Sequence, residues 1–272
     1  MGAWRAIEEV GLEVAGILGT SIGALVGAAI GSGVSTDDLE ERARAVRNRD
    51  IARIQRRAIW VNGIRTASVL RGDVLMSYIE DVLPTHDWDE LGMPVQVNAV
   101  ELGRGETEWF GVGARTDVSI PEAVYASAAL PVLYPPAKIG NGYYVDGGTG
   151  DALGLRRAKE LGADWILGVD VGSGPEADAS RVVEGGMVAI HQRVFSIQSG
   201  MARRAMVESW DAPPLLFIRP ELDGYKTFDF EHVAYFVDEG YRATRAALES
   251  LRKGEDPGRE VWAVPSGEEG VP

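Results

Sequence analysis

A short serine motif bracketed by glycines is the first part of this sequence that could do chemistry. Gly19-Thr20-Ser21-Ile22-Gly23 has the form G-x-S-x-G. A nucleophilic serine needs a sharp turn to project its hydroxyl, and flanking glycines avoid collisions with the strand before the turn and the helix after it. The Ile22 N–H would then point at the reacting oxygen, assisted by the positive end of the helix. The motif predicts acyl transfer through Ser21.

Asp146 is the candidate base for this serine. It ends the strand-like run Tyr143-Tyr144-Val145 and is followed by Gly147 and Gly148, which let backbone approach closely. Loops at the ends of strands are where α/β folds assemble their sites. A carboxylate whose pKa is raised by desolvation can remove a serine proton.

The three histidines are the alternative bases. His86 lies in a polar loop, whereas His191 and His232 lie in expected helices. In an α/β-hydrolase esterase the triad residues follow the chain order Ser, Asp, His. Such a triad would therefore require His191 or His232. Their distance from Ser21 cannot be read from the sequence.

Alternating strand-like and helix-like segments must position these groups, which predicts an α/β fold. Around Ser21 we expect a buried strand over Val14–Leu18 and a small-residue helix over Ile22–Ile30 packed tightly on a sheet. Ser35 is expected to cap a long polar helix that runs to about Arg57. Further strands are expected over 94–100, 106–112, 139–145, 165–171 and 215–218, and further helices over 4–10, 120–129, 151–161, 182–210 and 230–251.

Length and composition favour one folded domain. The chain has 272 residues, of which 45% are hydrophobic and 25% charged, and it shows no repeat or Gly/Ser linker. We expect a single domain over 1–256 and a polar C-terminal tail over 257–272. The uncharged stretch Val14–Ile30 is short and glycine-rich for a membrane span, and the acidic residues before it do not suit a signal peptide.

Charge and cysteine content exclude several functions. A net charge of −14 disfavours general nucleic-acid binding. The chain has no cysteine, which excludes disulfides, thiolate metal sites and cysteine nucleophiles and fits a cytoplasmic location.

The charge is locally reversed between Glu41 and Asp73. Asp50 is the only acid there, beside nine arginines. One hypothesis is peripheral docking on an anionic membrane surface. The other is a solvated helix face paired with nearby acids.

The two motifs and their surroundings resemble the patatin-like phospholipase family. The resemblance runs from Trp4 to about Leu251. It is carried by GTSIG, by ASAALPVLYPPAKIGNGYYVDGG, by LRRAKELGADWILGVDV and by FDFEHVAYFVDEGYRATRAAL. It implies a three-layer α/β sandwich with a central, mostly parallel sheet.

The resemblance also implies a mechanism. Ser21 would be the nucleophile of a Ser-Asp dyad that forms an acyl-enzyme with a phospholipid or lysophospholipid. Asp146 would be the general base and acid, and neither a metal nor another cofactor is implied. Gly19, Gly23, Gly147 and Gly148 would be the motif glycines and the Ile22 N–H an oxyanion donor.

Members of the family carry a glycine-rich loop, roughly G-G-G-x-R-G, that supplies most of the oxyanion donors. It precedes the helix that matches Trp4–Val10, and this sequence starts at Met1-Gly2-Ala3 without it. Three explanations are open: a start assigned too late, a fragment or degraded paralogue, or donors from another segment or partner. The alternatives to an active lipid acyl hydrolase are a catalytically impaired lipid- or partner-binding protein and a histidine-dependent esterase. The lipid cleaved and the oligomeric state are left open by the sequence.

Overall fold

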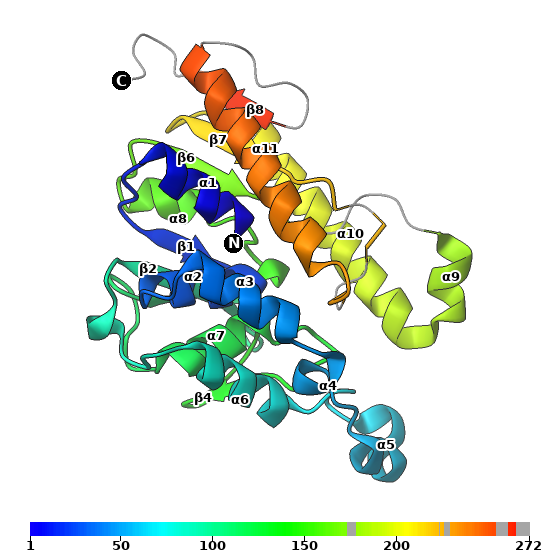
Figure 1. The fold of residues 1–272 in the computed structure, drawn as a ribbon. Helices are drawn as coiled ribbons and strands as arrows, with labels where there is room; N and C mark the ends of the chain where they lie inside the picture. The colour runs from blue at the N-terminus through cyan, green and yellow to red at the C-terminus, as the bar shows by residue number, and fades with distance from the viewer. Residues whose placement is uncertain (173–177, 223, 226–228, 254–260, 265–272) are drawn as a thin grey trace. The chain divides into compact units, whose positions relative to one another are not determined.

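A computed structural model describes residues 1–172, 178–222, 224–225, 229–253 and 261–264. These residues fall into two compact units, each with its own sheet (Figure 1). Unit 2 comprises Val14–Ala152 and Asp178–Ser199, and unit 1 comprises Met1–Glu13, Leu153–Ala177 and Gly200–Pro272. Ser21 and Asp146 both lie in unit 2. The single domain over 1–256 stays a prediction.

Unit 2 is built on a five-stranded sheet with β2 at its centre. Its strands are β1 (Ile17–Gly19), β2 (Val95–Glu101), β3 (Glu106–Gly111), β4 (Ala137–Ile139) and β5 (Gly142–Asp146). All seven residues of β2 are buried, because the strand has partners on both edges and helices packed against it. The strand therefore gives the site a rigid support.

Recognisable capping residues begin the helices of unit 2. α7 (Ile120–Ala128) is capped by Ser119, whose side chain accepts from the Glu122 N–H, with Pro121 in its first turn. α2 (Ile22–Gly31) lies close to the sheet, because a Cβ at Gly31 would come within 2.4 Å of the Val95 side chain. The remaining helices of unit 2 are α3 (Thr36–Ala45), α4 (Asn48–Ile51), α5 (Arg56–Asn62), η1 (Gly63–Arg65), α6 (Gly72–Val82), η2 (Trp88–Glu90), η3 (Gly147–Thr149), α9 (Ala179–Glu184) and the first part of α10 (Gly186–Glu208).

The long helix expected from Ser35 to about Arg57 is wrong. Ser35 caps α3 as predicted, but α3 ends at Ala45. The Arg47 guanidinium donates to the carbonyls of Arg44, Ala45 and Val46, and the Asp50 carboxylate accepts the Arg47 N–H at 2.9 Å. These local caps end one helix and start the next, α4, within a stretch whose composition suits continuous helix.

The α/β class is confirmed, but the described sheets are mixed rather than mostly parallel. β1 pairs with β2, and β6 with β7, in parallel, whereas four other pairings are antiparallel. Two of these four pairings are antiparallel because tight turns join β2 to β3 and β4 to β5, and a tight turn can only connect antiparallel neighbours.

Unit 1 contains a second sheet in the order β6 (Ile166–Val169), β7 (Leu215–Ile218), β8 (Val261–Val264). β7 is buried on both faces. Leu215 and Phe217 join one apolar cluster, whereas Leu216 and Ile218 join another with Ala243 and Ala247 of α11. The helices are α1 (Gly2–Val10), α8 (Leu155–Glu160), the end of α10 and α11 (Val233–Lys253).

Two features of unit 1 bear on the sequence analysis. α1 contains the helix expected over 4–10 and ends at the cap Gly11. It packs on α11 so closely that a Cβ at Gly2 would come within 1.9 Å of the Val237 carbonyl oxygen. β8 pairs antiparallel with β7 inside the region expected to be only a polar tail. Within the described part of the chain, no helix combines the length and apolarity needed to cross a bilayer.

Candidate active site

Ser21 lies in a strained turn between β1 and α2. Its backbone has φ 55° and ψ −120°, a conformation that residues with a side chain rarely adopt. Holding such a residue costs on the order of 1–3 kcal/mol, which the surrounding packing must offset. The sharp turn expected from the G-x-S-x-G motif is therefore present, and it places Ser21 at the start of a helix.

The two glycines of the serine motif are not equivalent. A Cβ at Gly19 would come within 2.5 Å of the Gly23 carbonyl oxygen and 2.7 Å of Ala24 Cα, so only glycine fits between strand and helix. A Cβ at Gly23 would meet no described atom within 4 Å. The expectation of a steric collision is therefore correct for Gly19 and wrong for Gly23, which faces open space.

Backbone N–H groups at the turn have distinct roles. The Ser21 N–H donates to Ser127 Oγ of α7 at 2.9 Å, and Ser127 is completely buried. That bond ties the strained turn to α7 and occupies the Ser21 donor. The Ile22 N–H takes part in none of the hydrogen bonds that the described turns and caps make. It is the backbone donor beside Ser21 that remains available to an incoming oxygen.

Asp146 ends β5 and is almost fully buried, with 1% of its surface exposed. Burial raises its pKa from 3.8 to about 6, while the Ser21 side chain and the Gly148 N–H each lower it. Asp146 Oδ1 accepts the Gly148 N–H at 2.8 Å. Oδ2 is buried and has no hydrogen-bond partner among the described residues, so no bond of ordinary length joins it to Ser21. A carboxylate in this setting is poised to take a proton.

Strand register explains why Ser21 and Asp146 come together. β1 runs parallel to β2 and its last residue, Gly19, pairs with Val97. β5 runs antiparallel to β2 and its last residue, Asp146, pairs with Ala99. Because β3 pairs along the other edge of β2, β1 and β5 share one edge and point toward each other. Their ends meet at the intervening residue, Asn98.

Asn98 connects the two motifs and was not singled out by the sequence analysis. It is completely buried, its Oδ1 accepts from Thr20 Oγ1 at 2.9 Å, and its Nδ2 donates to the Asp151 carbonyl at 2.6 Å. Gly147 packs against it, since a Cβ there would come within 2.1 Å of Asn98 Oδ1. One side chain therefore holds the residue before Ser21 and the turn after Asp146. The only signal in the sequence is a polar residue inside the apolar run Val97–Val100.

The second glycine after Asp146 is also crowded. A Cβ at Gly148 would lie 3.0 Å from Asp146 Oδ1, and 3.7 and 3.8 Å from the Phe195 and Ser199 side chains of α10. The absence of a side chain lets the Gly148 N–H approach the carboxylate. Both glycines thus serve the placement of Asp146.

Residues 1–159, more than half of the chain, match the family described as patatin-like phospholipase. The chain belongs to the patatin-like phospholipase family. The match includes both Ser21 and Asp146. It confirms the family resemblance drawn from the two motifs.

Relatives in the family are similar at low identity. An uncharacterized NTE family protein of Mycobacterium tuberculosis is 27% identical over 189 residues, covering 70% of this chain and 49% of that protein. The lysophospholipase nte1 of Aspergillus fumigatus is 27% identical over 272 residues, covering 93% of this chain and 17% of that protein. This chain therefore spans half or less of these relatives. The crystal structure of VipD from Legionella pneumophila shares the fold, with a TM-score of 0.51, 16% identity, and coverage of 92% of this chain and 64% of VipD.

The histidines of this patatin-like chain are all solvent exposed. His232 Nδ1 lies 2.7 Å from Asp229 Oδ1, and the His86 carbonyl accepts the Ile120 N–H. Among the described residues, no hydrogen bond joins a histidine to Ser21. Within the same part of the chain, no three His, Cys, Asp or Glu side chains form a cluster suited to a metal ion.

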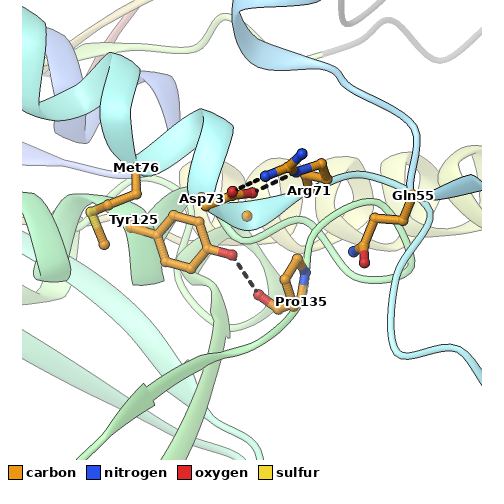
Figure 2. Close-up of a pocket in the computed structure, with 7 residues that line it drawn as sticks. Gln55, Arg71, Asp73, Met76, Tyr125 and Pro135 are labelled. Carbon is orange, nitrogen blue, oxygen red and sulfur yellow. Dashed lines mark hydrogen bonds and ion pairs between the residues drawn. The ribbon is translucent and has the colours of Figure 1, made fainter. Parts of the chain in front are cut away.

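A cavity of about 440 Å³ lies elsewhere in unit 2 (Figure 2). Its lining comprises Gln55, Arg71, Gly72, Asp73, Met76, Tyr125 and Pro135, and it includes neither Ser21 nor Asp146. The polar groups in it are largely paired: Arg71 with Asp73, and the Tyr125 hydroxyl with the Pro135 carbonyl at 2.9 Å. It is a structural cavity distinct from the candidate active site.

Proposed function

We propose that this chain is a serine lipid acyl hydrolase that cleaves carboxylic esters with a Ser21-Asp146 dyad. The observation that carries the proposal is the meeting of β1 and β5 on one edge of β2, which brings a strained serine and a buried, high-pKa carboxyl to the same point. Membership of the patatin-like phospholipase family supports the same reaction.

The proposed reaction has two halves. Asp146 accepts the Ser21 hydroxyl proton as Oγ attacks the ester carbonyl, while the Ile22 N–H stabilises the negative oxygen. The bond to the alcohol breaks, the alcohol takes the proton back, and Ser21 carries the acyl group. Water then gives a proton to Asp146 and attacks the acyl carbonyl. The bond to Ser21 Oγ breaks as Oγ takes this proton from Asp146, which releases the acid and restores both Ser21 and the carboxylate.

A phospholipid or lysophospholipid is the proposed substrate. The lysophospholipase nte1 of Aspergillus fumigatus, to which most of this chain is similar, supports the substrate class.

The proposed location is the cytoplasm, with peripheral contact to a membrane. The absence of cysteine is compatible with that location. No cofactor is proposed.

The test combines labelling of the nucleophile with kinetics on lysophosphatidylcholine. A fluorophosphonate should label Ser21 in the wild type, and Ser21→Ala and Asp146→Asn should each lower kcat by at least about 10³-fold. Ser32→Ala, at the other end of α2, and Asp89→Asn, on the surface, are matched controls that should keep full activity. The wild-type kcat/KM should rise with pH through about 6, because Asp146 must be ionised to act as base.

Other outcomes point to the other candidate functions. Lipid binding without labelling or turnover would mean a binding protein. Hydrolysis that survives Asp146→Asn but is lost in His191→Ala or His232→Ala would mean a histidine-dependent esterase. Unchanged hydrolysis in Ser21→Ala would overturn the assignment of the nucleophile.

A further inference from the structure

Residues 54–70 form a closed protrusion from unit 2, called here the α5 loop. Its two ends are held together by a bridge between Ile54 and Leu70. The Gln55 N–H donates to the Val69 carbonyl at 2.8 Å, and Gln55 Nε2 donates to Ser68 Oγ at 2.7 Å. A loop whose ends are pinned in this way is a defined structural element, comparable to an Ω-loop.

The base of the α5 loop is anchored and its tip is not covered. Ser68 and Leu70 are buried, and the Val69 and Leu70 N–H groups donate to the carbonyls of Val132 and Leu133. At the tip, the Trp60 side chain is 87% exposed and Val61 is 64% exposed. In Figure 1, α5 lies beyond α4 and α6, far from β1 and β2 of the same unit. The fold thus carries a large aromatic side chain outward on a fixed base.

The helical geometry of α5 separates an outer face from an inner one. Trp60 is four residues after Arg56, and Val61 is four after Arg57, so these four side chains share one side of the helix. All four are exposed, whereas Ala58 and Ile59 on the opposite side are partly buried. The outer face combines an indole and a branched aliphatic group with two guanidinium groups.

The charge of the α5 loop is uniformly positive. It contains Arg56, Arg57 and Arg65 and no acidic residue, and Arg53 stands just before it. All four arginines are exposed, and none forms an ion pair with a carboxylate among the described residues. The alternative hypothesis, a solvated helix face whose arginines pair with nearby acids, therefore does not describe these four arginines.

We propose that the α5 loop docks the chain on an anionic phospholipid surface, with Trp60 and Val61 entering the interface and Arg53, Arg56, Arg57 and Arg65 contacting headgroups. Tryptophan favours the boundary between headgroups and acyl chains. Arginines near an anionic leaflet each strengthen binding. A nucleic acid could use the same charges but would leave the exposed Val61 side chain unused, and the net charge of −14 opposes it. The inference deepens the proposed lipid hydrolase but does not need turnover at Ser21.

The experiment is vesicle co-sedimentation of the full chain carrying Ser21→Ala, so that binding is measured without hydrolysis. Vesicles are phosphatidylcholine alone or an equimolar mixture of phosphatidylcholine and phosphatidylserine. We expect binding to the mixed vesicles only. Arg56→Gln with Arg57→Gln should weaken it by about fivefold for each arginine removed. Trp60→Ala should weaken it by at least about tenfold.

Matched controls show whether an effect on vesicle binding is specific to the α5 loop or arises from any exposed apolar side chain or arginine. Met187→Ala removes another highly exposed apolar side chain, and Arg156→Gln with Arg252→Gln removes two exposed arginines of unit 1. These variants should bind as the wild type does. Equal binding of the α5-loop variants and the wild type would overturn the proposal, as would equal binding to both vesicle types. Loss of a dimer in lipid-free Trp60→Ala would also overturn it, by assigning the loop to a second copy of the chain. The labelling and hydrolysis assays with Ser21 intact report on the dyad separately.

Discussion

Burial raises the pKa of Asp146 and makes its ionisation costly to the fold. Its pKa is about 6 in the folded chain against 3.8 for an exposed aspartate. A raised pKa means that the folded state binds the proton more tightly than the unfolded state. Stability is therefore greatest below the lower pKa and is lost as pH rises through the higher one. At neutral pH this difference between the two pKa values lowers the free energy of unfolding by about 3 kcal/mol.

This cost can be measured with Asp146→Asn, which cannot ionise but keeps an oxygen for the Gly148 N–H. The free energy of unfolding of the variant relative to the wild type should shift by about 2.5 kcal/mol in favour of Asn between about pH 4 and about pH 8. Any constant cost of the amide cancels in that difference. Urea unfolding at several pH values is the measurement, with Asp89→Asn as the exposed control. A flat difference would show that Asp146 is not desolvated.

At the same scale, local patterns in the sequence single out the proposed reacting groups but not the groups that hold them. Ser21 and Asp146 stand in local patterns with glycines, which a reader can recognise without knowing the fold. Asn98 and Ser127 do not, because each acts on residues far away in the chain: Asn98 on Thr20 and Asp151, and Ser127 on Ser21. Partners that are set by strand register and helix packing leave no local pattern.

At the scale of elements, β2 is the part that aligns the site. Asn98→Ala would leave the Thr20 hydroxyl and the Asp151 carbonyl without their shared partner. The Ser21 turn and the loop after Asp146 would then no longer be held by the same side chain. We expect a loss of about 10–100-fold in kcat with little change in KM, because misplaced reacting groups slow the chemistry rather than binding. Unfolding stability should fall by about 1–3 kcal/mol.

Gln96→Ala is the matched control for this prediction. Gln96 is also a buried polar residue of β2, and its Nε2 donates to the Val112 carbonyl at 2.6 Å. It should lose stability to a similar extent and keep its kcat. The rate of fluorophosphonate labelling gives a second readout. If both variants lose kcat in proportion to stability, Asn98 has only a structural role.

Elements themselves were predicted well where turns and caps punctuate the chain. Ser35 caps α3 as expected, and the helix expected over 4–10 is the later part of α1, which ends at the cap Gly11. The prediction failed between Ser35 and Arg57, where charged side chains cap helices that composition alone would join. It also failed for strand direction, since hairpin turns and crossover connections were not distinguished when a mostly parallel sheet was expected.

At the scale of the whole molecule, charge is distributed very unevenly. Nine arginines and Asp50 give residues 42–71 a net charge of +8, which leaves −22 on the rest of a chain whose total is −14. An anionic surface therefore attracts this segment and repels the remainder. Attraction at short range, where the α5 loop would touch headgroups, must exceed repulsion from the more distant acids.

The sign of the salt dependence tests whether attraction by the arginines or repulsion by the acidic residues governs membrane binding. If the α5 loop makes direct contact, added NaCl should weaken binding of the Ser21→Ala chain to vesicles containing phosphatidylserine, because screening removes the attraction. The variant with Arg56→Gln and Arg57→Gln should bind more weakly and show a shallower salt dependence. If the average charge governed the encounter, added salt would instead strengthen binding by screening the repulsion. Co-sedimentation across a range of NaCl concentrations distinguishes the two, and strengthening with salt would contradict a docking role for these arginines.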